Sequence, residues 1–201
     1  MGRKAVGTKN NKPSGSGMKR AMAAAFKIPM MKNNDSRLVY LSGDVTEDSI
    51  SEIQEQLLDL ASASRDPIHL VVSTYGGAVH EMFSLYDVMK FIPAPVYTVG
   101  LGKVMSAGSL ILAAGEKGHR MIGASTRVMI HSLSAGFFGN LFELVNEIDE
   151  IKRLQDMYVS KMVAETKMCK NDVNAMLKTK VDSVFSAQQA VELGIVDKII
   201  T

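Results

Sequence analysis

The chain has 201 residues, of which 46% are hydrophobic, and this suits a single globular domain with a sizeable core. Its one cysteine, Cys169, cannot form an internal disulfide, so nothing in the composition argues for secretion. No run of about 18 apolar residues is present to cross a membrane. The sequence therefore favours a cytoplasmic protein that does not act through a membrane.

Charge is distributed unevenly along the chain. The net charge is +2, but residues 1–34 hold eight Lys and Arg and no acidic residue, which leaves the remainder at −6. Because this basic start is rich in Gly, Ser and Asn, we interpret it as a flexible, solvated tail, with a transit peptide or a cleaved propeptide as the alternatives. Its charges have little aromatic interleaving, so we expect no nucleic-acid partner.

The body of the chain alternates strand-like and helix-like segments. In chain order, the pattern first predicts a strand at Leu38–Leu41 and a helix from Thr46, whose apolar residues are Ile50, Ile53, Leu57 and Ala61. It then predicts a strand at Ile68–Val72, a helix between Gly77 and Pro93, a strand at Val96–Val99 and a short helix near Ser106. The last predicted elements are a strand at Arg127–His131, a short helix from Ser186 to Gly194 and a strand at Val196–Ile199. Such alternation predicts an α/β fold with a mostly parallel sheet, flanking helices and right-handed crossovers.

A longer helical pattern lies between these segments. Apolar residues recur at helical spacing from Leu141 to about Lys167. A helix of this length would extend about 40 Å, which is more than a small domain covers by itself. Two arrangements therefore stay open, one in which the helix lies along its own sheet and one in which it projects toward another subunit.

Several side chains with catalytic potential stand where predicted strands end. Ser106 opens an apolar helix, where free N–H groups favour a developing negative charge, although helix-capping serines are far commoner than nucleophiles. His131 ends an apolar strand, and sites gather at such ends in parallel sheets. Of the other histidines, His69 is interpreted as structural and His119 as a surface residue, whereas His80 follows a Gly-Gly turn and stays a candidate.

Other motifs are weaker or missing. The Gly76-Gly77 pair permits unusual backbone angles and close approach of a ligand, or forms a simple tight turn. Asp182 fits a loop as well as a site. The sequence has no phosphate-binding loop of the GxxxxGK[ST] type and no Cys/His cluster with metal spacing, so we expect no ATPase motor within the chain, no metal and no cofactor.

Together, these residues stand in blocks that resemble the Clp protease proteolytic-subunit family from about Val39 to Ile200, roughly four-fifths of the chain. The matching blocks are Ser73-Thr-Tyr-Gly-Gly-Ala-Val79, Val104-Met-Ser-Ala-Gly108, Ile111-Leu-Ala-Ala-Gly-Glu-Lys-Gly118, Val128-Met-Ile-His131 and Asp182-Ser-Val-Phe-Ser-Ala-Gln-Gln-Ala190. The match needs no gap from Gly77 to His131. This resemblance implies a ClpP/crotonase-like fold and a divergent member of peptidase family S14.

The resemblance also implies roles for individual residues. It makes Ser106 the nucleophile, His131 the base and Asp182 the acid that orients the base, with the backbone N–H groups of Gly77 and Ala107 as the oxyanion hole. It implies that substrate is bound by a set of five residues, Gly76, Ala78, Val79, Leu133 and Ser134. The domain would span 35–201.

At the level of assembly, the resemblance implies a homo-oligomer of seven-membered rings stacked as a tetradecamer, with the 141–167 helix as the handle between rings. An AAA+ unfoldase would feed it unfolded polypeptides, and 1–34 would be a propeptide or axial region.

The sequence departs from the family at the substrate groove, the ring contact and the N-terminus. Tyr75 and Leu133 replace prolines, Lys180 and Val181 replace an acidic residue and an arginine, and the tail lacks the family's axial-loop motif. Two alternatives therefore stay open: a motor-independent processing peptidase of the phage type, and a non-catalytic ring subunit or crotonase-like acyl-CoA enzyme.

Overall fold

The computed structural model describes residues 37–179 and 181–200, and the predicted basic segment at 1–34 lies outside this part of the chain. Its strands are β1 (Leu38–Ser42), β2 (Ile68–Thr74), β3 (Val96–Met105), β4 (Met121–Gly123), β5 (Arg127–Ile130), β6 (Ser183–Phe185) and β7 (Lys198–Ile200). Its helices are α2 (Glu47–Ala63), α3 (Val79–Phe91), α4 (Ala107–Ala113), α5 (Leu141–Glu165), α6 (Lys170–Lys178) and α7 (Ala187–Glu192).

The described strands form one sheet in the order β1-β2-β3-β4-β7, in which every neighbouring pair is parallel. Strand β3 is long enough to pair with two strands, since Val99 pairs with Met121 of β4 while Met105 pairs with Met129 of β5. Strand β6 adds an antiparallel edge next to β5. The mostly parallel α/β fold expected from the sequence is confirmed.

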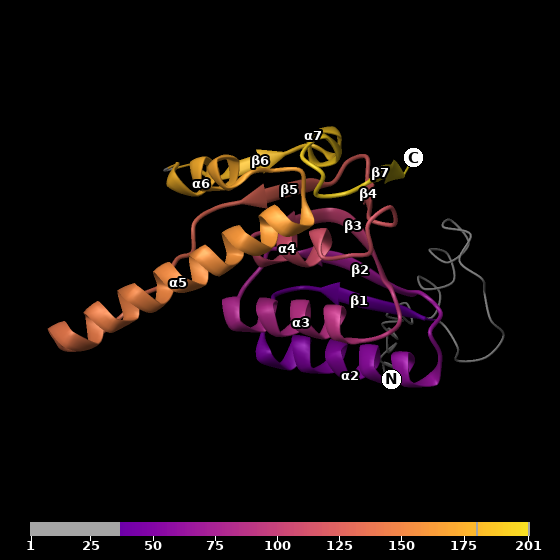
Figure 1. Ribbon diagram of the computed structural model, residues 1–201, viewed down its shortest axis with the longest axis horizontal. Helices are drawn as coiled ribbons and strands as arrows, with labels where there is room; N and C mark the ends of the chain where they lie inside the picture. The colour runs from indigo at the N-terminus through magenta and orange to yellow at the C-terminus, as the bar shows by residue number, and fades with distance from the viewer. Residues whose placement is uncertain (1–36, 180, 201) are drawn as a thin grey trace, which may run out of the picture. The chain divides into compact units, whose positions relative to one another are not determined.

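The helices cover the sheet and enclose the core (Figure 1). Helix α2 packs on β1 and β2, α3 on α2 and α4, and α4 on β3. Each residue of α4 is buried, and all but the polar Ser109 are apolar or glycine, as expected of a central core helix. The fully buried side chains with the largest volumes include Leu41, Ile50, Leu70, Leu85, Leu110, Ile122 and Ile130.

Helix α5 is half core element and half projection. From Leu154 to Met162 it buries residues against the domain, whereas its first part is exposed at Leu141 (71%) and Phe142 (81%). Figure 1 shows this first part extending away from the sheet. Asn140 caps the helix by accepting from two N–H groups, and Glu143 returns a bond to the Asn140 N–H at 2.8 Å. The structure therefore has the projecting arrangement, and none of the described helices is long and apolar enough to cross a membrane.

Some predicted boundaries were wrong. The strand predicted to end at Val99 continues to Met105, because Gly102 lies at an irregularity in the β2–β3 pairing and does not end the strand. The last strand starts at Lys198, two residues later than predicted, because the preceding residues form the buried turn after α7. The short elements β4, β6 and α6 were missed. The short helix predicted from Ser186 is present as α7, and Ser186 is its N-cap residue.

Candidate active site

The ends of β3 and β5 bring Ser106 and His131 together. The two strands run parallel, with Met105 opposite Met129, so the residues that follow them lie at the same edge of the sheet. The Ser106 N–H extends the ladder by donating to the Met129 carbonyl at 2.9 Å. His131 Nε2 lies 2.8 Å from Ser106 Oγ, a hydrogen-bonding distance. The residues predicted as nucleophile and base therefore form a pair.

Ser106 holds a backbone conformation that side-chain-bearing residues rarely adopt. Its φ is 54° and its ψ is −120°, and among residues 37–179 and 181–200 it is the one non-glycine residue with a positive φ. It stands at the N-cap position of α4, but its side chain makes no capping hydrogen bond. Ser106 therefore does not act as a helix-capping serine, which is the commoner role of a serine at this position. Strain of this kind gathers at active sites, and a tight strand-to-helix turn also exposes the serine of α/β-hydrolases.

The Gly76-Gly77 turn packs against this strained residue. The φ values of the two glycines, 101° and 150°, are ones that other residues rarely adopt. A Cβ on Gly76 would lie 2.6 Å from the Cβ of Ser106, closer than real side chains approach. Thr74 Oγ1 accepts the Gly76 N–H at 2.9 Å, and the Val45 N–H donates to the Gly76 carbonyl at 2.8 Å. Both glycines are therefore needed for this turn.

Two backbone N–H groups beside Ser106 have no acceptor within the described residues. They belong to Gly77 and to Ala107, the first residue of α4, and they are the groups predicted to form an oxyanion hole. The next N–H along the chain, that of Ala78, is already used by the Val45 carbonyl at 2.9 Å. The free pair is what a backbone oxyanion hole requires, since its donors must be available to substrate.

Asp182 lies next to His131 in the strand register but is not bonded to it. In the antiparallel β5–β6 pair, Ile130 lies opposite Ser183. If the same register continues by one residue, His131 lies opposite Asp182. Asp182 is exposed, and no hydrogen bond between Asp182 and the His131 ring is present among residues 37–179 and 181–200. The structure thus places Asp182 opposite His131 in the register, and the orienting role of Asp182 stays a prediction.

A cavity of about 330 Å³ opens in front of Ser106 and His131. Its other lining residues are Gly77, Ala78, Val79, Leu133, Ser134, Ala135, Ile151 and Leu154. Four of the five predicted substrate-binding residues are in this set, whereas the fifth, Gly76, is buried and packs against Ser106. Ile151 and Leu154 were not predicted to belong to the site. Their helical spacing indicates an apolar helix face, but it does not show that this face lines a cavity.

The other histidines lie away from this cavity. His80 is exposed in the first turn of α3 and does not line the cavity. His69 on β2 contacts Tyr97 edge-on, and His119 stacks on the same ring at 4.0 Å. Burial, followed by the nearby charge of His119, lowers the pKa of His69. His131 is therefore the histidine that the structure makes available to Ser106.

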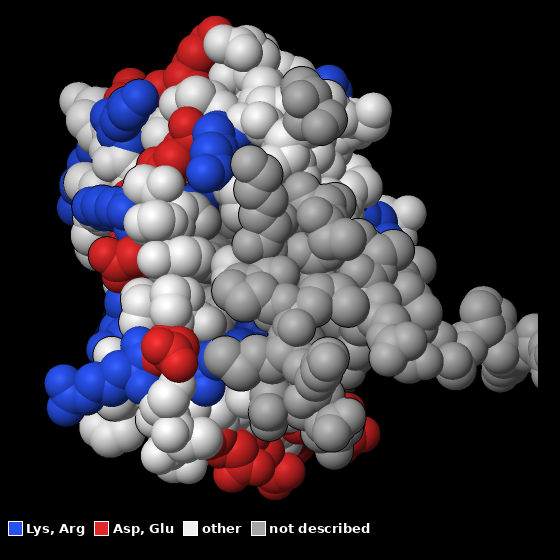
Figure 2. All heavy atoms as spheres, turned by 90° about the vertical axis from the view of Figure 1, so that its right-hand side faces the viewer, with Lys and Arg blue, Asp and Glu red and all other residues white. Residues whose placement is uncertain are grey.

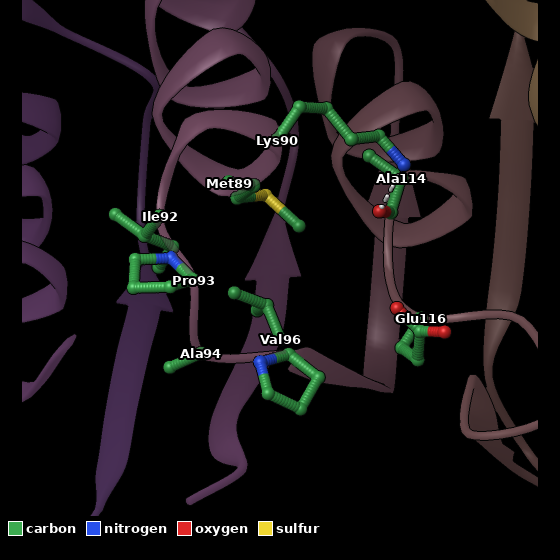
Figure 3. Close-up of a pocket in the computed structure, with 9 residues that line it drawn as sticks. Met89, Lys90, Ile92, Pro93, Ala94, Val96, Ala114 and Glu116 are labelled. Carbon is green, nitrogen blue, oxygen red and sulfur yellow. Dashed lines mark hydrogen bonds between the residues drawn. The ribbon is translucent and has the colours of Figure 1, made fainter. Parts of the chain in front are cut away.

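A second cavity, of about 210 Å³, lies at the opposite end of β3, near Val96 (Figure 3). Lys90 reaches across it to donate to the Ala114 carbonyl at 2.9 Å, and its ammonium also pairs with Glu165 at 2.8 Å. Among the described residues, no Ser, Thr, Cys or His lines this cavity. It therefore offers no hydroxyl, thiol or imidazole side chain, and the candidate active site stays at the Ser106 cavity.

Charged side chains on the face in Figure 2 do not gather by sign. Over the described residues of that face, Lys and Arg are interspersed with Asp and Glu. Within residues 37–179 and 181–200, no group of three or more His, Cys, Asp or Glu has metal-binding geometry. The expectations of no nucleic-acid partner and no metal stay predictions.

A serine in a strained strand-to-helix turn, bonded to a histidine at the edge of a parallel sheet, is typical of serine hydrolases. The model of the Clp protease family matches residues 23–201. The chain is also similar to the ATP-dependent Clp protease proteolytic subunit of Deinococcus radiodurans, with 33% identity over 165 residues that cover 82% of this chain and 80% of that protein. The chain therefore belongs to the Clp protease family and is a peptidase.

Proposed function

We propose that the protein is a serine endopeptidase in which Ser106 is the nucleophile, His131 the general base and Asp182 the residue that orients the base. The observation that carries this proposal is the 2.8 Å distance between Ser106 Oγ and His131 Nε2. The serine is not used as a helix cap, which leaves its hydroxyl free to react. A non-catalytic ring subunit or a crotonase-like acyl-CoA enzyme would not need a strained serine bonded to a histidine.

The proposed reaction follows the serine-peptidase sequence. Ser106 Oγ attacks the scissile carbonyl carbon while His131 Nε2 takes its proton, and the carbonyl oxygen becomes an oxyanion that accepts from the Gly77 and Ala107 N–H groups. The imidazolium then gives its proton to the leaving amine, and the peptide C–N bond breaks. Water, deprotonated by His131, hydrolyses the acyl-enzyme. Asp182 would accept from His131 Nδ1 and stabilise the imidazolium.

The proposed substrates are unfolded polypeptides in an extended conformation. Leu133 and Ser134 come shortly after β5, two and three residues beyond His131, and they line the cavity, so their backbone is placed to pair with an extended chain. The cavity walls contributed by Val79, Ile151 and Leu154 are apolar. An apolar side chain next to the scissile bond therefore fits the cavity best.

The proposed assembly is a homo-oligomer of heptameric rings stacked as a tetradecamer. Its support is an apolar stripe on α5 and the loop before it, exposed at Phe138, Leu141, Phe142, Val145 and Ile148. Exposed stripes of this kind mark interaction surfaces, and a second copy of α5 is the occupant we propose. The D. radiodurans relative is named as ATP-dependent. By analogy, we propose an AAA+ unfoldase as partner and the cytoplasm as compartment.

A fluorophosphonate probe tests the catalytic proposal. The wild-type protein should be labelled at Ser106 at neutral pH, and His131→Ala should abolish labelling because the serine loses its base. His80→Ala is the matched control and should label normally. A wild-type protein that is not labelled would contradict the serine mechanism.

An unlabelled sample of the same protein distinguishes the motor-dependent peptidase from its motor-independent alternative, because the probe blocks Ser106 irreversibly. Turnover of a folded substrate that rises on addition of an AAA+ unfoldase and ATP would support the partner. Labelling without any unfoldase-stimulated turnover would favour the motor-independent processing peptidase. Native mass measurement separates a monomer, one ring and two rings.

A further inference from the structure

The carbonyl of Ser106 is held by a second serine, Ser109. The Ser109 N–H donates to this carbonyl at 2.9 Å, as expected in the first turn of a helix, and the Ser109 hydroxyl donates to the same oxygen at 2.6 Å. Ser109 is completely buried. A helix start does not need the hydroxyl bond, so it is an additional restraint on the residue that carries the nucleophile.

A tyrosine on α5 fixes the direction of that hydroxyl. Tyr158 Oη lies 2.8 Å from Ser109 Oγ, and Tyr158 is 4% exposed. A serine hydroxyl has one proton, so if Ser109 donates to the Ser106 carbonyl, Tyr158 must donate to Ser109. Burial raises the pKa of Tyr158 to about 12, which keeps its proton in place at neutral pH. The result is a directed chain of two hydrogen bonds from α5 to the Ser106 carbonyl.

That carbonyl shares one planar peptide group with the Ala107 N–H. Whatever fixes the carbonyl direction therefore fixes the opposite direction of this N–H, which is one of the two free donors beside the nucleophile. The hydrogen bond from Ser109 thus restrains a residue with a strained backbone, since the φ of Ser106 is 54°. A rotation of the Ser106–Ala107 peptide would change the ψ of Ser106, which is now −120°, and would turn the N–H away from its present direction.

We propose that Tyr158 and Ser109 are positioning residues that hold the Ser106–Ala107 peptide in the orientation needed to stabilise the oxyanion. This inference rests on the proposed serine-peptidase function and adds residues that touch neither substrate nor His131. Tyr158 and Ser109 act through the backbone of Ser106. They should therefore stabilise the transition state without changing the affinity for substrate.

The test compares Tyr158→Phe, Ser109→Ala and the double variant in the full-length protein with a chromogenic peptide ester. We expect kcat to fall about 3- to 10-fold in Tyr158→Phe and about 10- to 100-fold in Ser109→Ala, less than the roughly 100- to 1,000-fold loss on removing an oxyanion donor outright. KM should stay within about twofold. Because Tyr158 acts only through the hydrogen bond that it makes to Ser109, the double variant should be no slower than Ser109→Ala.

A peptide aldehyde gives a readout that a merely structural role would not move. Its adduct with Ser106 places an oxygen in the oxyanion hole, so its affinity should fall by the same factor as kcat in each variant. Tyr86→Phe is the matched control, since it also removes one buried tyrosine hydroxyl, which bonds Glu165 at 2.7 Å. It should lower the melting temperature without lowering kcat or aldehyde affinity.

Two results would overturn the inference alone. One is a wild-type protein that is labelled and active while both Tyr158→Phe and Ser109→Ala keep full kcat and aldehyde affinity. The other is a loss of kcat in Tyr86→Phe equal to that in Tyr158→Phe, which would make the effect one of general stability. A wild-type protein that is neither labelled nor active would instead overturn the proposed function, and the inference with it.

Discussion

Gly76 lies so close to Ser106 that a Cβ at position 76 would stand 2.6 Å from the Ser106 Cβ and 2.9 Å from the Met105 carbonyl oxygen. The Gly-Gly turn is thus part of the support of the serine as well as the source of a predicted oxyanion donor. Any side chain at position 76 must displace either the turn or the strained residue.

Gly76→Ala should therefore abolish most activity. We expect peptidase activity to fall at least about 100-fold, because both the serine and the Gly77 N–H move. We also expect unfolding free energy to fall by about 1–3 kcal/mol, because alanine is strained at φ 101°. Kinetics and chemical denaturation check the two effects.

Gly43→Ala is the matched control. Gly43 has a similar φ of 108°, but a Cβ there would meet no atom within 4 Å. It should lose comparable stability from backbone strain and keep its activity. Equal activity losses in the two variants would show that strain, and not the contact with Ser106, is responsible.

Asp182→Asn tests the third member of the proposed triad. An asparagine cannot stabilise the imidazolium and can leave His131 in the wrong tautomer, so kcat should fall about 100- to 10,000-fold. Since Asp182 is exposed, the melting temperature should hardly change. Asp59→Asn, at an exposed position on α2, should be silent in both measurements. An unchanged kcat in Asp182→Asn would mean that Ser106 and His131 work as a dyad.

The meeting of Ser106 and His131 was foreseeable from the sequence, for two reasons. Strand ends in a parallel sheet share one edge, and the family blocks around both residues match without a gap. The alternation of strands and helices likewise gave the α/β class. These features depend on local patterns, which a single sequence displays directly.

Other features depend on contacts between distant elements and could not be predicted. The periodicity of α5 shows that Ile151 and Leu154 are apolar, but not that they close a cavity in front of Ser106. The bond between Ser109 and Tyr158 joins residues 49 positions apart and has no motif. The strand predicted to end at Val99 continues to Met105, because pairing with β5 extends β3.

Val145→Lys tests the proposed assembly. Val145 is 48% exposed on the apolar stripe of α5, so a charge there should leave the fold intact and weaken the contact that the stripe is proposed to make. We expect native mass measurement to shift from the largest assembly toward smaller species. Glu147→Lys introduces positive charge on the opposite, polar side of α5 and should leave the assembly unchanged. Identical assemblies in Val145→Lys and the wild type would exclude the stripe as a subunit contact.

Asp197→Asn should destabilise the fold in a pH-dependent way. Burial alone would raise the pKa of Asp197, but hydrogen bonds and charge from Arg120 outweigh it and hold that pKa below its usual value. A carboxyl with a lowered folded-state pKa stabilises the fold above its unfolded pKa of about 3.9, and loses this contribution as pH falls through the folded pKa. In urea titrations at fixed protein concentration, Asp197→Asn should cost about 2–4 kcal/mol at pH 7, because buried Arg120 loses its counter-charge, and less at a pH below the unfolded pKa of about 3.9. Asp87→Asn, which breaks an exposed pair with Lys161, should cost under about 1 kcal/mol. A loss in Asp197→Asn that is equal at both pH values would rule out the ion pair as its cause.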